Sequence, residues 1–129
     1  MRGDLSVPRF VVMVIDDDSG VRNSLKFSLE VEGFAVCTYA NGNELLNAED
    51  LMHCSCFVVD QNMPGMNGLE LVALLRARHL SAPAILITSH PGPSLRARAS
   101  EAGVPIVEKP LLNNVLLDKI RDLVAATPS

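Results

Sequence analysis

The chain has 129 residues, 48% of them apolar, which is enough for one domain with a single hydrophobic core. Its 11 basic and 15 acidic residues give a net charge of -4, and aromatic residues are few, so the composition does not suit direct nucleic-acid binding. No apolar run approaches the roughly 18 to 20 residues of a bilayer span, and residues 1–9 are too polar for a secretory leader. We therefore expect a cytoplasmic protein that does not enter a membrane.

The first half of the chain alternates strand-like and helix-like patterns. Residues 10–15 (FVVMVI) are apolar without alternation, which indicates a strand covered on both faces. The stripe of Val21, Leu25 and Leu29 predicts a helix that closes at Gly33, a left-handed C-cap. Residues 34–39 have mixed polarity and suit an edge strand, and residues 42–48 suit a short helix.

The second half repeats the alternation. We expect strands at residues 57–59, 84–87 and 104–107, and helices at residues 69–80, 94–102 and 112–124. Ser94 is the predicted N-cap of the second of these helices, and Gly103 lies just beyond its end. The pattern predicts one doubly wound α/β domain, a (βα)5 unit with a five-stranded parallel sheet and helices on both faces. This single domain spans residues 1–129, with its core at about residues 10–124 and frayed ends at residues 1–8 and 126–129.

Polar side chains follow four of the five predicted strands. In an open parallel sheet, functional groups collect at the carboxyl ends of the strands, near the point where the strand order reverses. The residues at these ends are Asp16, Asp17 and Asp18 after the first strand, Asp60 after the third, Thr88 and Ser89 after the fourth, and Lys109 after the fifth.

Converging carboxylates need a positive partner. Two unit charges about 4 Å apart repel by about 4 kcal/mol at an effective dielectric constant near 20. A bound divalent cation would offset this repulsion, and because the ligands are oxygens, Mg²⁺ or Mn²⁺ fits better than zinc. Carboxylates, a hydroxyl and an ammonium around such an ion suit the transfer of a phosphoryl group.

Four motifs resemble those of the receiver domains of bacterial two-component response regulators. They are residues 14–22 (VIDDDSGVR), 59–68 (VDQNMPGMNG), 86–90 (LITSH) and 107–111 (VEKPL). The resemblance covers roughly residues 10–124, and His90 makes it closest to the branch of the nitrogen-fixation regulators. It implies the flavodoxin-like strand order 2-1-3-4-5.

The resemblance also implies a role for each site residue. Asp60 would be the phosphoacceptor nucleophile, Thr88 would bond a phosphoryl oxygen, and Lys109 would pair with the carboxylate or the phosphate. The metal site would consist of Asp17 and Asp60 as direct ligands, Asp16 acting mostly through water, and the backbone carbonyl of Asn62. The bond between Lys109 and Pro110 is expected to be cis.

The implied function is that of a signalling switch, not an enzyme. The domain would take a phosphoryl group from a sensor histidine kinase or a histidine phosphotransfer protein onto Asp60, and would then regulate an output domain or a downstream protein. Family members can also form homodimers through the fourth helix, fifth strand and fifth helix, which no residue here establishes.

Three residues depart from the family pattern. Ile106 stands where the family usually has Tyr or Phe, so an aromatic switch is not expected. Gln61, directly after the acceptor, is less usual, and His90 lies where it could influence attack by water on the phosphate.

Two other functions compete with this interpretation. The spacing Asp16-x-Asp18 resembles the nucleophile motif of haloacid-dehalogenase-like phosphatases, although the later acids Asp118 and Asp122 fall within a helical period and not at a strand end. The second alternative is a degenerate receiver that acts only as a binding module.

Simpler structural roles remain for two further features. Asp18 by itself is expected to cap a helix. Cys54 and Cys56, with His53, do not complete a zinc site and are interpreted as free thiols at the entry of a buried strand.

Overall fold

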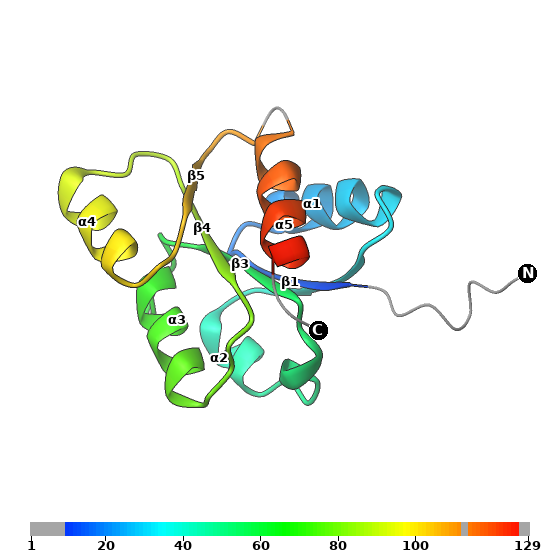
Figure 1. The fold of residues 1–129 in the computed structure, drawn as a ribbon, viewed down its shortest axis with the longest axis horizontal. Coiled ribbons are helices and arrows are strands. Elements are labelled where there is room, and N and C mark those ends of the chain that lie inside the picture. Colours follow the sequence, from blue (N-terminus) through cyan, green and yellow to red (C-terminus); the bar gives the residue numbers. More distant parts are fainter. Residues whose placement is uncertain (1–9, 112–113, 127–129) are drawn as a thin grey trace, which may run out of the picture.

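Five parallel strands and five helices alternate along the chain in the computed structural model, which describes residues 10–111 and 114–126 (Figure 1). The elements are β1 (Val11–Ile15), α1 (Ser19–Val31), β2 (Ala35–Tyr39), α2 (Gly42–Leu46), the 3-10 turn η2 (Leu51–His53), β3 (Cys56–Asp60), α3 (Gly68–Ala77), β4 (Ala84–Thr88), α4 (Pro93–Glu101), β5 (Ile106–Glu108) and α5 (Val115–Ala126). The sheet order is β2-β1-β3-β4-β5, so the predicted doubly wound architecture is confirmed.

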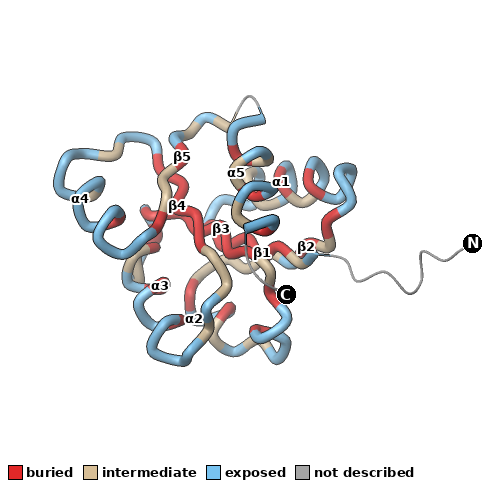
Figure 2. The backbone as a smooth tube through the Cα atoms, viewed as in Figure 1, coloured by how far each residue is buried: buried red, intermediate tan, exposed pale blue. Residues whose placement is uncertain are grey.

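The two faces of the sheet are covered by different helices. Figure 1 shows α1 and α5 on one face and α2, α3 and α4 on the other. Successive residues of a strand point to opposite faces, so Met13 and Ile15 join the core under α2 to α4, while Val12 and Val14 join the core under α1 and α5. Both cores need apolar side chains, which is why the central strands show unbroken apolar runs. Figure 2 accordingly shows these strands buried and the outer surfaces of the helices exposed.

Helix ends in the first half of the chain follow the predicted signals. The Asp18 carboxylate caps α1 by accepting hydrogen bonds from the backbone N–H groups of Gly20, at 2.8 Å, and Val21, at 3.2 Å. Gly33 follows α1 with a φ of 99°, in the left-handed region, as its role as a C-cap requires. The capping interpretation of Asp18 is therefore confirmed.

Two boundaries in the second half were predicted wrongly. α4 begins at Pro93 and its N-cap is Gly92, so Ser94 lies within the first turn and is not the cap. Proline suits this position because it fixes a helical φ where no N–H is needed. β5 begins at Ile106, not at residue 104, because the Val104 N–H donates to the Ala99 carbonyl at the end of α4 and Pro105 has no N–H.

Smaller differences concern the ends of other elements. α2 ends at Leu46 and α3 at Ala77, both earlier than predicted, while β3 extends to residues 56–60 and β4 to Thr88. Ala126 closes α5 instead of belonging to a frayed end, and position 112 of the predicted last helix lies outside the described residues. Across the described ranges, no helix has the length and apolar character needed to cross a bilayer.

The end of α3 is strained at His79, whose φ is 63°. A side chain in this left-handed region costs roughly 1 kcal/mol, which glycine avoids. We expect His79→Gly to raise the free energy of unfolding by about 1 kcal/mol in a denaturant titration. The control Ala73→Gly, at an exposed position inside the same helix, should lower it by a similar amount. A destabilised His79→Gly protein would show that the His79 side chain stabilises this turn.

Candidate functional site

The reversal of strand order brings the predicted acidic residues together. β1 lies between β2 and β3 in the sheet. The strand order therefore reverses between β1 and β3, with β2 on one side of this point and β4 and β5 on the other. The register opposes Ile15 to Val59, which places Asp16 and Asp60 next to each other at the ends of adjacent strands. Asp60 in turn lies opposite Ile87, one residue before Thr88. The expected gathering of polar groups at one edge is therefore observed.

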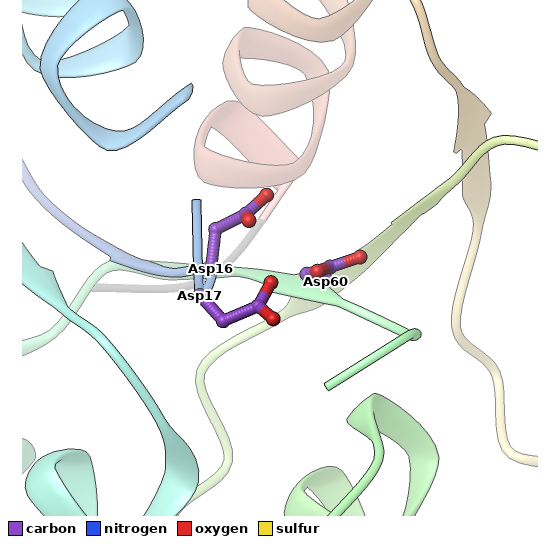
Figure 3. A group of neighbouring side chains, drawn as sticks. All are labelled: Asp16, Asp17 and Asp60. Atoms are coloured by element: carbon purple, nitrogen blue, oxygen red, sulfur yellow. The ribbon is translucent and has the colours of Figure 1, made fainter. Parts of the chain in front are cut away.

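Three carboxylates form a compact cluster at this edge. One oxygen from each of Asp16, Asp17 and Asp60 lies within 4.8 Å of the others (Figure 3). Asp16 and Asp60 are buried, with relative exposures of 0% and 2%, whereas Asp17 is exposed. The cluster is thus buried at Asp16 and Asp60 and open to solvent at Asp17.

Lys109 supplies the positive charge next to the buried pair. Its Nζ lies 3.1 Å from Asp16 Oδ2 and 3.4 Å from Asp60 Oδ1. Its backbone N–H donates to the Thr88 carbonyl at 2.8 Å, which fixes the end of β5 against β4. The peptide bond from Lys109 to Pro110 is cis, as expected. The Lys109 ammonium is therefore held where its positive charge can offset the negative charge of Asp16 and Asp60.

The pKa values of Asp60 and Lys109 reflect this arrangement. Burial and the nearby Asp16 charge raise the pKa of Asp60, and the Asn62 N–H and Lys109 oppose this shift only in part. Burial by itself lowers the pKa of Lys109, but the close contact of its ammonium with the Asp16 carboxylate, together with Asp60, raises it overall. Lys109 is therefore protonated at neutral pH, whereas burial and the Asp16 charge disfavour the ionised form of Asp60.

Asp16 is fixed from several directions yet keeps one oxygen unsatisfied. Its Oδ1 accepts from the Asp18 N–H at 2.9 Å, and its backbone carbonyl accepts from Arg22 Nη1 at 2.6 Å. Its Oδ2 forms an ion pair with Lys109 Nζ at 3.1 Å, but this contact lacks the geometry of a hydrogen bond, and no described residue donates a hydrogen bond to this oxygen. A buried polar atom without a partner is rare and costly. A hydrated cation above the cluster would supply that partner, so the all-oxygen ligand set fits Mg²⁺.

Asn62 connects Asp60 to Thr88. Its backbone N–H donates to Asp60 Oδ1 at 3.2 Å, and its side-chain Nδ2 donates to Thr88 Oγ1 at 3.1 Å. Because the Thr88 hydroxyl accepts this bond, its own proton is free to be donated elsewhere. Asn62 therefore orients the hydroxyl of a side chain that is itself buried.

The structure adds three residues whose contacts the sequence analysis did not predict. Arg22 binds the Asp16 carbonyl, and Gln61 binds the start of α3. Gly68 allows close packing, because a Cβ there would lie 2.8 Å from the Asp60 carbonyl oxygen and 2.6 Å from Leu86 Cδ1. All three residues fall within motifs that were identified, but no spacing signal reveals the partners of Arg22 and Gln61.

The unusual residues lie around this cluster. Ile106 is half-buried, opposite Leu86 in β4, and packs against the core under α2 to α4. His90 is exposed and lines a hollow, together with Lys109, between α1 and the start of α5.

The cysteines take no part in the site. Burial raises the pKa values of Cys54 and Cys56 to about 12, so both thiols are protonated at neutral pH. They are free and buried, as predicted, while Cys37 is free and exposed. Protonated thiols are poor zinc ligands.

The fold and the acidic edge define a doubly wound α/β domain that gathers carboxylates, a hydroxyl and an ammonium where the strand order reverses. Residues 12–121 match the family described as the response regulator receiver domain. The chain belongs to this family and is a receiver domain of two-component response regulators, whose role as phosphoacceptors follows from the family.

Several known proteins are similar to this chain. The C4-dicarboxylate transport transcriptional regulatory protein DctR of Rhodobacter capsulatus is 36% identical over 120 residues, which are 91% of this chain and 61% of DctR. The transcriptional regulatory protein FixJ of Bradyrhizobium diazoefficiens is 32% identical over 114 residues, which are 88% of this chain and 56% of FixJ. The crystal structure of FixJ-N superposes with a TM-score of 0.81 at 28% identity, covering 95% of this chain and 99% of that one.

These similarities test two of the earlier interpretations, the likeness to nitrogen-fixation regulators and the phosphatase alternative. The expected likeness to nitrogen-fixation regulators is confirmed by the FixJ matches. The phosphatase alternative is wrong, because the family match spans nearly the whole chain and the Asp18 carboxylate caps α1. The chain spans about 56 to 61% of the length of these two curated relatives.

The raised pKa of Asp60 has a consequence for stability. A carboxyl whose pKa is raised on folding favours the folded state when protonated, and this advantage is lost as the pH rises through the raised pKa. We expect Asp60→Asn to stabilise the protein in EDTA at neutral pH, on the order of 1 kcal/mol, since Lys109 already offsets part of the repulsion. Thermal melts at several pH values should show the gain growing from acidic to neutral pH. A stability gain that does not depend on pH would show that it does not come from removing the Asp60 charge.

Proposed function

We propose that Asp60 is the residue that accepts the phosphoryl group, with Mg²⁺ bound beside it. The observation that carries this proposal is the position of Asp60 at the end of β3, buried between Asp16 and Lys109 and open to Asp17. Burial and a raised pKa are features that cluster at functional sites.

The contacts of Asp60 favour one oxygen as the nucleophile. The Asn62 N–H and the Lys109 ammonium both contact Oδ1. Oδ2 would then attack the phosphorus atom, forming an acyl phosphate while the bond from phosphorus to the donor breaks. The Thr88 hydroxyl, oriented by Asn62, would donate its proton to a phosphoryl oxygen. Lys109 would stay close to the new anionic group.

The ligand set of the metal is also a proposal. Asp17 and Asp60 would bind Mg²⁺ directly, Asn62 through its backbone carbonyl, and Asp16 mostly through water; Mn²⁺ would fit the same oxygens. When bound, the ion would offset the charge of the carboxylates and of the phosphoryl oxygens. Support comes from the clustering of the three carboxylates and from the unsatisfied Oδ2 of Asp16.

The wider role follows from the family and from the relatives. Receiver domains of response regulators interact with kinases, and we propose a sensor histidine kinase or a histidine phosphotransfer protein as the donor. We further propose that residues 1–129 form one cytoplasmic receiver domain, a switch and not an enzyme, without nucleic-acid binding of its own. DctR and FixJ are transcriptional regulators, which supports an output domain or a downstream protein that controls transcription.

Labelling with a small phosphodonor tests the acceptor. Incubation with acetyl phosphate and Mg²⁺ should add one phosphoryl group to the wild-type protein in intact-mass spectrometry, and Asp60→Asn should remove the adduct. Asp18→Asn is the matched control, because asparagine caps a helix as well as aspartate does and labelling should persist. An adduct that survives in Asp60→Asn would move the site to Asp16 or Asp17. Unlabelled wild-type protein would instead favour the degenerate binding module.

Thermal melts with and without Mg²⁺ test the metal site. Asp17 is exposed, so Asp17→Asn should change the melting temperature in EDTA little, but it should remove most of the stabilisation that Mg²⁺ gives to the wild-type protein. Asp18→Asn should keep the full gain. If Asp17→Asn gains as much from Mg²⁺ as the wild-type protein does, Asp17 is not a ligand.

A further inference from the structure

Gln61 is a buried polar residue directly after the proposed acceptor. Its relative exposure is 7%, and its backbone N–H donates to the Ile87 carbonyl at 2.9 Å, so it continues the pairing of β3 with β4. Its side chain turns to α3, where Oε1 accepts from the backbone N–H of Leu69 at 3.0 Å. Neither the acceptor chemistry nor the metal ligands proposed above use this side chain.

Gln61 satisfies two of the first three N–H groups of α3. The backbone carbonyl of Gln61 accepts from the Gly68 N–H at 3.2 Å, and its side chain accepts from the Leu69 N–H. The third group, the Glu70 N–H, is bound at 2.9 Å by Asn67, the N-cap within the capping box. The first N–H groups of a helix have no partner within it, so these bonds close the helix end. One residue next to Asp60 therefore ties the start of α3 to the end of β3.

The loop that this tie closes contains Asn62. Asn62 follows Gln61 directly, and its own bonds reach Asp60 through the backbone and Thr88 through the side chain. Gly68, at the far end of the loop, lies so close to the Asp60 carbonyl and to Gln61 Cα that a Cβ would not fit there. Both ends of the loop are therefore packed against each other. A residue fixed through its N–H, its carbonyl and its side chain leaves its neighbour little freedom to turn.

We propose that Gln61 is a positioning residue, which holds the loop from Asp60 to Gly68 so that Asn62 presents its carbonyl to the metal and its amide to Thr88. This inference rests on the proposed metal site. It differs from a capping role alone, because capping would stabilise α3 without changing the affinity for an ion. Groups that orient metal ligands commonly change metal affinity when they are removed.

The experiment compares two ways of weakening the same helix end. Gln61→Met removes the acceptor at similar volume, whereas Asn67→Ala removes the neighbouring cap bond to Glu70 and leaves Gln61 in place. Both variants should melt at a lower temperature in EDTA. By isothermal titration calorimetry, only Gln61→Met should bind Mg²⁺ more weakly, by about tenfold. Gln61→Glu keeps an acceptor oxygen and should not bind more weakly than the wild-type protein.

A second measurement needs no substitution. Coupling between two sites is reciprocal, so Mg²⁺ should slow hydrogen exchange at the Leu69 amide of the wild-type protein more than at the Glu70 amide, which is bound by Asn67. Equal Mg²⁺ affinity in Gln61→Met and wild-type protein, or no added protection at Leu69, would contradict the proposal. Either result would show that Gln61 caps α3 without positioning Asn62. Wild-type protein that shows no Mg²⁺ binding would remove the proposed metal site itself, and with it this role.

Discussion

The contact of the Lys109 ammonium with two buried carboxylates is the interaction on which the rest of the site depends. Asp16 and Asp60 are nearly inaccessible to solvent, and two such charges at adjacent strand ends repel each other. Removing one partner from a buried charge cluster is strongly destabilising, because the remaining charge loses its compensation. Lys109 therefore offsets part of the repulsion between the carboxylates, while burial and the Asp16 charge still raise the pKa of Asp60. The three clustered carboxylates are also the oxygen ligands that a divalent cation of the Mg²⁺ type prefers.

The two-sided packing of the sheet explains why such a cluster can persist. Val12, Val58 and Ile85 pack on one face of the central strands, and Met13, Phe57 and Leu86 on the other. Each buried aliphatic side chain contributes roughly 1.5 to 3 kcal/mol relative to an exposed one. The sum over both faces offsets the electrostatic cost at the carboxyl edge. The sheet is thus stabilised along its length and carries its unfavourable charges only where the strands end.

The elements differ in how far the sequence could predict them, for physical reasons. The strands β1, β3 and β4 were predictable because burial on both faces leaves an unbroken apolar run, and the strand ends then identified Asp16, Asp60 and Thr88. β5 was misplaced because Val104 is apolar and buried for another reason, the closing turn of α4. The partners of Arg22 and Gln61 could not be predicted, since their bonds join backbone groups and any residue type supplies a backbone carbonyl or N–H. Propensity and periodicity describe single segments, whereas these bonds depend on how segments meet.

The weak anchoring of α4 indicates which helix would move most readily after a change at Asp60. Asn62 joins Asp60 to Thr88, so a change around Asp60 would reach the end of β4 through these two bonds. Beyond Thr88 the chain passes Pro91 to α4, whose N-cap Gly92 makes no side-chain bond and whose one fully buried residue is Ala99. α3, by contrast, has a capping box and buries Leu71, Val72 and Leu75. Ile106 is β-branched and stiff, and it carries no hydroxyl that could form a new bond. Because segments with few buried contacts open at the lowest cost, a shift of Thr88 meets less resistance at the start of α4 than at α3.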